Sequence, residues 1–277
     1  MDYIDLHIHT NFSDGSLAPQ EVVDISIKRG LKVISITDHD NIDGVSSVIN
    51  KTPLHDGIKI IPGVEISAKY EKAIEREIHI LGYFIDIKNE ALSKKLVYYR
   101  EERKKRALKI IEKFNKIGIS IDESLLNSTN SIGRLHIAKY LVNKGIVKNI
   151  KEAFKKYLGY NCTCYVMKNM FTVEEAIQTI VEANGLPILA HPMISFNNIK
   201  MIEELLEKGI IGIEVWHTKH TSSDVNMLYS FAKKRKLIIT GGSDCHGYVN
   251  GNSPIIGSLK IPYKIYIMLH SIKNQKI

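Results

Sequence analysis

The strongest constraint on the fold of this 277-residue chain is an alternation of short apolar, β-branched runs with amphipathic helical patterns. Strands buried on both faces and separated by helices favour a parallel sheet covered by helices. Seven such strands suggest a closed, irregular α/β barrel, whose active residues gather at the carboxyl ends of the strands. The predicted strands are 3–9, 33–37, 58–67, 77–85, 187–190, 210–216 and 237–241.

One long segment interrupts this alternation. Residues 89–168 contain several helical patterns and no convincing buried strand, which predicts a helical insertion standing over the barrel mouth. The barrel itself would then consist of residues 1–88 and 169–277. The predicted helices of the insertion are 89–117, 133–144 and 149–158.

Composition and charge limit the possible partners. The net charge of +8 favours an anionic partner, although lysine is spread over the helical patterns. Within the insertion, the run 99–106 mixes acids and bases, so a solvated helix face is favoured there over a nucleic-acid patch. The chain has no signal-peptide pattern and no apolar window of about 20 residues, so a cytoplasmic protein without a membrane partner is expected. No obligate protein partner is inferred.

The first predicted strand carries a pair of histidines. In an extended strand alternate side chains share a face, so His7 and His9 project together. The turn that follows returns the carboxylate of Asp14 to the same place. Asp244 and His246 repeat this two-residue spacing after the last strand. Two imidazoles side by side form half of a metal site.

Further potential ligands accompany the other strands. Independent structural histidines have no reason to fall at the same end of successive strands, so their joint placement favours metal binding. Imidazole and carboxylate donors without thiolate suit Mn²⁺, Fe²⁺ or Zn²⁺ better than Mg²⁺. Two or three divalent ions, with Mn²⁺ preferred, would lower the pKa of a bridging water and attract a phosphate. The nine candidates are His7, His9, Asp14, His39, Glu65, His79, His191, Asp244 and His246.

These motifs resemble the PHP (polymerase and histidinol phosphatase) superfamily. The matching segments are His7-Ile8-His9 with Asp14, Thr37-Asp38-His39, Gly63-Val64-Glu65, His79, Ala190-His191-Pro192 and Ser243-Asp244-Cys245-His246. The resemblance implies a distorted (β/α)₇ barrel and a trinuclear metal centre. It also implies three ligand sets: His7, His9, Glu65 and Asp244; then Asp14, His39 and His246; then His79 and His191, with Glu65 as a bridge.

The insertion contains a more specific similarity. Gly133-Arg134-Leu135-His136-Ile137-Ala138 is similar to a segment of the branch that includes nucleoside 3′,5′-bisphosphate phosphatases and 5′-to-3′ exoribonucleases. Arg134 follows a turn at a helix start, where a guanidinium and free N–H groups would bind a substrate phosphate. Residues two apart lie on nearly opposite helix faces, which complicates a joint role for His136. His217 and His220, after the strand at 210–216, are further substrate-binding candidates.

We therefore expect a metal-dependent phosphoesterase. Its substrate would be a small nucleotide, such as a 3′,5′-bisphosphonucleotide, or the 5′ end of short single-stranded RNA, attacked by a metal-activated hydroxide. Asp14, His39 and Asp244 are the metal-linked catalytic candidates, and the leaving-group acid is open between Asp14, Asp38 and His217. One alternative is a histidinol-phosphate phosphatase. A second is a non-catalytic metal-binding module of a nucleic-acid-processing assembly.

Overall fold

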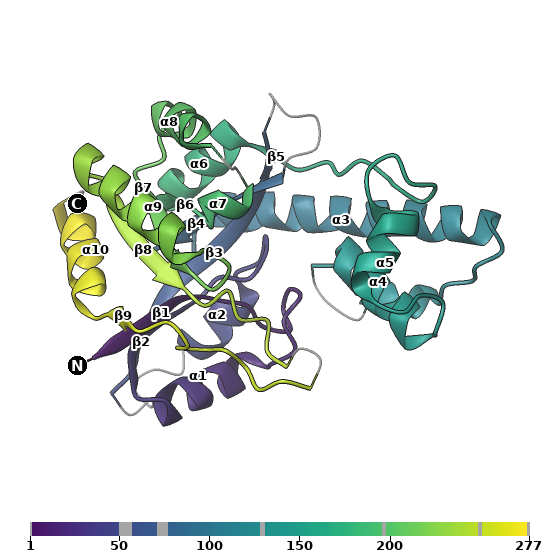
Figure 1. The fold of residues 1–277 in the computed structure, drawn as a ribbon, viewed down its shortest axis with the longest axis horizontal. Coiled ribbons are helices and arrows are strands. Elements are labelled where there is room, and N and C mark those ends of the chain that lie inside the picture. Colours follow the sequence, from purple (N-terminus) through teal and green to yellow (C-terminus); the bar gives the residue numbers. More distant parts are fainter. Residues whose placement is uncertain are drawn as a thin grey trace.

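Seven strands form the wall of a barrel in the computed structural model, which describes residues 2–49, 57–70, 77–127, 131–195, 198–248 and 251–275 (Figure 1). Both ends of each strand lie within two residues of the ends predicted from the sequence. The wall strands are β1 (Tyr3–Ile8), β2 (Leu31–Ile36), β3 (Lys59–Lys69), β4 (Glu77–Tyr83), β6 (Leu186–Leu189), β7 (Gly212–His217) and β8 (Ile238–Gly242). Two short strands were not predicted: β5 (Phe171–Thr172) pairs with β3, and β9 (Ile261–Pro262) pairs with β1.

The strands follow one another around the wall in the order β8, β7, β6, β4, β3, β2 and β1. The wall closes between β1 and the segment after β8. There the N–H of His9 donates to the carbonyl of Cys245, and the N–H of Asp244 donates to the carbonyl of His7, both at 2.9 Å. The predicted distorted α/β barrel is confirmed.

The expectation of a parallel sheet is wrong at β4. This strand runs antiparallel to both of its neighbours, β3 and β6, whereas β1, β2 and β3 are mutually parallel, as are β6, β7 and β8. The reason is the length of the connection. Residues 70–76 are all that separate β3 from β4, and parallel neighbours need a crossover of a dozen residues or more.

Helices cover the outside of the barrel and bury its apolar wall. They are α1 (Pro19–Lys28), α2 (Asp43–Ile49), α6 (Val173–Glu182), α7 (Pro192–Ser195), α8 (Ile199–Glu207), α9 (Ser222–Arg235) and α10 (Lys264–Gln275). The predicted capping box of α6 is present, with the Thr172 hydroxyl accepting from the N–H of Glu175 and the Glu175 carboxylate accepting from the N–H of Thr172. Strand residues such as Val64, Ile188 and Ile213 are fully buried in the resulting core.

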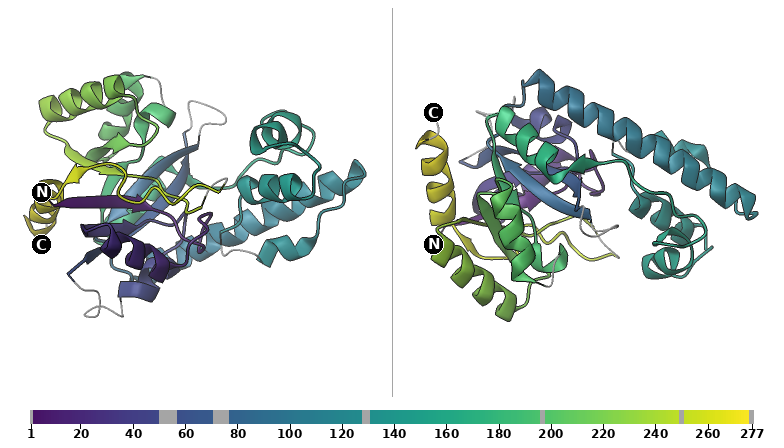
Figure 2. Two further views of the ribbon diagram at one scale, coloured as in Figure 1. Left: turned by 60° about the horizontal axis from the view of Figure 1, so that its bottom comes forward. Right: turned by 90° about the horizontal axis from the view of Figure 1, so that it is seen from above.

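The helices between β4 and β5 project to one side of the barrel (Figures 1 and 2). They are α3 (Glu90–Lys116), the 3₁₀ helix η1 (Glu123–Asn127), α4 (Arg134–Asn143), α5 (Ile150–Ala153) and the π-helical turn η2 (Phe154–Leu158). Near its start α3 packs on the barrel core through Leu92 and Leu96, and from Ala107 onward it belongs to a second apolar cluster. Among the described residues, no helix is both long and apolar enough to cross a lipid bilayer.

Candidate metal centre

The histidine pair of β1 lies at the middle of the site. The Nε2 atoms of His7 and His9 are 3.1 Å apart, on the same face of the strand as predicted. A Glu65 oxygen lies 3.3 Å and 3.1 Å from these two nitrogens. An Asp244 oxygen lies 3.5 Å and 3.2 Å from them. The structure thus brings together all four residues of the first expected ligand set.

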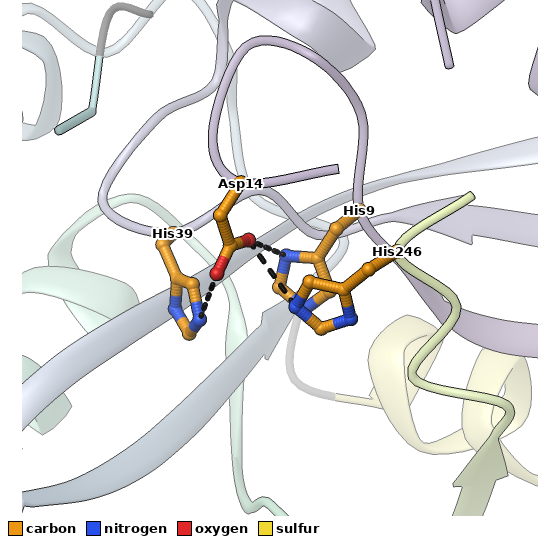
Figure 3. Close-up of side chains that lie close together, drawn as sticks. All are labelled: His9, Asp14, His39 and His246. Carbon is orange, nitrogen blue, oxygen red and sulfur yellow. Dashed lines mark ion pairs between the residues drawn. The ribbon is translucent and has the colours of Figure 1, made fainter. Parts of the chain in front are cut away.

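A second group surrounds Asp14, as Figure 3 shows. One carboxylate oxygen of Asp14 lies 3.2 Å from Nε2 of His246 and 3.7 Å from Nδ1 of His9. The other oxygen lies 3.9 Å from Nε2 of His39. The expected set of Asp14, His39 and His246 is therefore assembled, with His9 beside it.

A third group shares Glu65. Its second oxygen lies 2.9 Å from Nδ1 of His79 and 3.1 Å from Nε2 of His191, and these two nitrogens are 3.2 Å apart. The first oxygen also lies 3.2 Å from Nδ1 of His39, so Glu65 faces all three groups. The nine candidate donors thus converge on one place from seven separate segments of the chain.

Two of these candidate ligands do not lie at the carboxyl end of a strand, where the sequence analysis predicts the active residues. Glu65 is in the middle of β3, because β3 continues to Lys69. His79 is near the beginning of β4, opposite Ser67, because β4 runs antiparallel. The reversed strand therefore brings its amino-terminal part to the mouth that the parallel strands reach with their carboxyl ends.

The orientation of the rings suits metal ligation. The outward nitrogens of three histidines face acceptors: Glu214 at 3.0 Å from His7, the Asp244 carbonyl at 2.8 Å from His246, and Glu77 at 3.5 Å from His79. A proton on each outward nitrogen leaves the inward nitrogen with a lone pair directed at the carboxylates. Metal-bound histidines in proteins are held in this way.

The charges and unpaired atoms of the cluster also fit a cation. Among the described residues, Oε2 of Glu65 and Nδ1 of His39 are buried and have no hydrogen-bond partner, although they lie 3.2 Å from each other. Burial alone would raise the pKa of Glu65 and of Asp244, but the facing histidines hold both pKa values well below the usual range. Burial would lower the pKa of His79, yet Glu65 and Glu77 raise it to about 9. The carboxylates are thus ionised and require positive charge beside them, which comes from protonated histidines or from a metal ion that replaces their inward protons.

Glu214 supports two of the ligands and was not predicted. It is fully buried on β7, where one carboxylate oxygen accepts from Nδ1 of His7. The other oxygen accepts from the backbone N–H of His191 at 2.9 Å. The sequence contains one indication of this role, a carboxylate inside the apolar run Ile213-Glu214-Val215. A charge at such a buried position requires a partner.

Two further carboxylates behind the ligands bind cations from the helical segment, and neither pair was predicted. Arg103 of α3 donates from Nε to Asp40 at 2.7 Å and from Nη2 to Ser67 at 2.8 Å. Lys168 forms a short ion pair with Glu77, the carboxylate that faces His79. Part of the charged run 99–106 on α3 is therefore buried against the barrel. The prediction of a solvated helix face is wrong for Arg103, and Arg103 does not belong to a nucleic-acid patch either.

The histidines expected to bind substrate on the loop after β7 lie at the same mouth. His217 accepts from the N–H of Lys219 at Nδ1, so its Nε2–H donates to Asp244 at 3.2 Å. His220 donates from Nδ1 to the carbonyl of Val215 at 2.9 Å. Its Nε2 is buried and has no hydrogen-bond partner among the described residues.

The two candidates on α4 have different surroundings. Nδ1 of His136 accepts from the N–H of Gly133 at 3.0 Å, and Nε2 lies 3.2 Å from the carbonyl of Ser13. His136 therefore faces the loop that carries Asp14, and both of its ring nitrogens have protein partners. Arg134 donates from Nη1 to the carbonyl of Leu158 at 3.2 Å.

The three residues considered for the leaving-group acid are also placed. Asp38 accepts hydrogen bonds from the hydroxyls of Thr10 and Ser13, both at 2.6 Å, and from the N–H of Thr10 at 2.7 Å. It thus holds the loop before Asp14 from behind. Asp14 and His217 face the cluster directly.

Comparison with known proteins gives consistent matches. The model of the PHP domain matches residues 5–161. A 5′-3′ exoribonuclease of Haemophilus influenzae is 34% identical over 87% of this chain and 89% of that protein. A 3′,5′-nucleoside bisphosphate phosphatase of Chromobacterium violaceum is 32% identical over 92% of this chain and 91% of that protein. A crystal structure from Bifidobacterium adolescentis, described as a metal-dependent phosphoesterase, has a TM-score of 0.84 at 26% identity and covers 98% of this chain and 96% of its own.

Proposed function

The chain belongs to the PHP domain family, and we propose on that basis that it is a metal-dependent phosphoesterase acting on nucleotides. Its substrates are 3′,5′-bisphosphonucleotides or the 5′ ends of short single-stranded RNA. The relatives named as exoribonuclease and bisphosphate phosphatase support this choice, since each aligns with most of the chain. The single observation that carries the proposal is the convergence of nine imidazole and carboxylate side chains, with Glu65 at their centre as one of the nine.

The proposed cofactor is a set of two or three divalent ions, with Mn²⁺ preferred over Fe²⁺ and Zn²⁺. The absence of thiolates among the clustered donors supports this preference. When bound, such ions supply a Lewis acid and an activated water for hydrolysis of a phosphate ester. The proposed ligand sets are the three expected from the family resemblance, with Glu65 shared between them.

The protein's own residues then orient the reaction. Asp244 is held by the Nε2–H of His217, which fixes the carboxylate with one oxygen toward the histidine pair. His217 is the proposed proton donor to the leaving group, because its Nε2–H faces the cluster. His246 and His39 hold the pKa of Asp14 well below its usual range, so Asp14 carries no proton to donate, and Asp38 is engaged with Thr10 and Ser13. Arg134 and His220 are the proposed contacts to a non-reacting part of the substrate. His136 positions the loop of Asp14 through the carbonyl of Ser13.

We also propose that residues 89–168 act as a helical insertion that covers the mouth. The contacts of α4 with the Asp14 loop support this, since Nζ of Lys139 donates to the Asp14 carbonyl at 3.2 Å and His136 contacts Ser13. A substrate bound at the metal cluster would therefore lie between the barrel and α4.

Three substrates offered to the Mn²⁺-loaded protein test the proposal. Adenosine 3′,5′-bisphosphate and a short 5′-phosphorylated RNA should be hydrolysed in preference to histidinol phosphate, with bound metal quantified in the same sample. A preference for histidinol phosphate would instead identify a histidinol-phosphate phosphatase. Inactivity on all three, with metal bound, would favour a non-catalytic metal-binding module.

A further inference from the structure

The positive charge of the chain is concentrated toward its carboxyl terminus. Residues 225–275 contain seven lysines and arginines and a single acid, Asp244, which is a candidate metal ligand. This part of the sequence therefore supplies most of the net charge of +8. Four of the seven cations are consecutive, at 233–236, where α9 ends.

A groove with an apolar floor lies beside these four cations. It has a volume of about 290 Å³ and lies between the end of α9, the start of β8 and α10. No carboxylate lines it among the described residues, and Lys233 and Lys236 contribute the charged part of its lining. Its apolar lining consists of Ala232, Leu237, Ile238, Ile239, Met268 and Ile272.

The helix α10 also exposes apolar side chains next to this groove. Its residues Ile265 and Leu269 are buried in the barrel core, whereas Ile267 and Met268 are 51% and 47% exposed. A surface helix normally confines its large apolar residues to the stripe that faces the core. Exposed apolar side chains that continue into a groove mark a surface for interaction with another molecule.

The lysines beside the groove lack carboxylate partners. Within the run 233–236, only Arg235 forms an ion pair with a carboxylate of the described residues, that of Glu203. Lys233 instead lies over the ring of Tyr229, at 5.6 Å from its centroid. The positive charge at the groove is therefore available to an acidic partner.

Lys236 occupies a backbone position that suits glycine better. It follows the last residue of α9 with a φ of 55°, in the left-handed region. Helices commonly end on a glycine in this conformation, because a side chain makes it unfavourable. The stability of α9 therefore does not explain a lysine at this position, whereas a binding role for its charge at the rim of the groove does.

The groove distinguishes between three kinds of occupant. A second copy of this chain in a symmetric pair would bring the same cations together, which is unfavourable. Single-stranded nucleic acid binds through aromatic side chains on which its bases stack, but the floor of this groove is aliphatic. A helix with an apolar face and acidic flanks matches both the floor and the lysines.

We propose that the groove between α9 and α10 is a docking site for an acidic amphipathic helix of a partner protein. The groove borders Ile238 at the amino end of β8, whereas the candidate metal ligands Asp244 and His246 follow its carboxyl end. The helix α10 also lies on the side of the barrel away from the helical insertion (Figures 1 and 2). A partner bound there leaves the metal centre open, so the proposal goes beyond the phosphoesterase function and does not depend on it.

Fluorescence anisotropy with three labelled synthetic peptides tests the proposal on the full chain. The first peptide has leucines along one helical face and glutamates on the other; the second has lysines in place of the glutamates, and the third has serines in place of the leucines. Wild type should bind only the first, more weakly as salt is added. Met268→Ser should weaken this binding about tenfold, as expected for truncation of a central apolar contact. Met167→Ser, at a 65% exposed position between η2 and β5, is the matched control and should bind as wild type does.

Lys236→Gly separates docking from folding. Because the variant loses a charge but relieves the left-handed backbone, it should bind the acidic peptide about twofold to fivefold more weakly without a fall in Tm. Lys109→Gln, at an exposed position on α3, is the control and should leave binding unchanged.

Three results would overturn the docking site. The first is no binding of the acidic peptide by wild type. The second is unchanged affinity in either Met268→Ser or Lys236→Gly. The third is a response of Met268→Ser in self-association, in binding of phosphatidylserine vesicles or in binding of single-stranded RNA, without binding of the acidic peptide, because the surface would then belong to that other occupant.

Discussion

Glu214 gives the sharpest test of how the barrel holds its proposed metal ligands. Its two oxygens accept from Nδ1 of His7 and from the backbone N–H of His191, so one carboxylate orients ligands of two groups. Glu214→Gln keeps the shape, but its amide has one oxygen for two donors, and its NH₂ group must face the other N–H. One hydrogen bond is therefore lost, and the charge beside His7 is lost with it.

The expected magnitude follows from that count. A hydrogen bond to a charged group contributes about 1.5–3 kcal/mol, which corresponds to about 10- to 150-fold in metal affinity. This range overlaps the 10- to 100-fold effects of removing partners of metal-bound histidines. Glu214→Gln should thus release metal at lower chelator concentration than wild type, with one ion lost first. Glu203→Gln, which removes only a surface ion pair with Arg235, is the control and should release metal as wild type does.

Metal content would be measured after dialysis against a chelator series, with circular dichroism to verify folding. Wild-type affinity for every ion in folded Glu214→Gln would refute the reasoning, because Glu214 would then have no part in orienting His7. Loss of metal in the control as well would show that the assay reports general stability.

Two further predictions concern stability. Burial and repulsion from Arg103 lower the pKa of Lys168 from 10.5 to about 8, so the unfolded chain binds more protons than the folded one between these pH values. This group therefore destabilises the fold fully below pH 8, and the effect is relieved as pH rises toward 10.5. Urea titrations at pH 7 and 9.5 should show wild type gaining about 2 kcal/mol relative to Lys168→Met, and a constant difference would contradict the shift. Removal of metal by a chelator should lower Tm, because an ion at 1,000 times its Kd stabilises the folded state by about 4 kcal/mol. Calorimetry should show that added Mn²⁺ restores the original Tm. An unchanged Tm after chelation would mean that the cluster holds no ion.

The sequence was sufficient for the parts of the site that depend on local spacing. His7 and His9 share a face because a strand alternates its side chains, and the observed strand ends follow the apolar runs closely. The direction of β4 was not visible in the same way. Periodicity reports burial but not strand direction, and only the short connection at 70–76 distinguished an antiparallel neighbour from a crossover.

The prediction of a solvated helix face on α3 was wrong at Arg103 for a different reason. Leu96, Arg103, Ile110 and Phe114 recur at helical spacing and are all buried, so Arg103 occupies an apolar stripe. A run of charged residues in the sequence suggests a solvated segment. When the same residues are placed on a helix, the buried position of Arg103 predicts a buried carboxylate opposite it. That partner, Asp40, lies more than 60 residues earlier in the chain. Such a partner is determined by the tertiary fold and has no local signal.

The backbone at the site indicates that the barrel directs the candidate ligands. Three non-glycine residues at or next to the ligand positions have positive φ angles: 50° at Asp40, 27° at His191 and 52° at Asp244. Such conformations cost about 1–3 kcal/mol each unless the surroundings hold them. In each case the residue's own N–H is held from a neighbouring strand, by the Glu65 carbonyl, the Glu214 carboxylate and the His7 carbonyl, respectively. The hydrogen bond of Asp244 lies at the closing seam between β1 and the segment after β8, and that of His191 joins the end of β6 to β7. The strands of the wall therefore direct these two side chains inward.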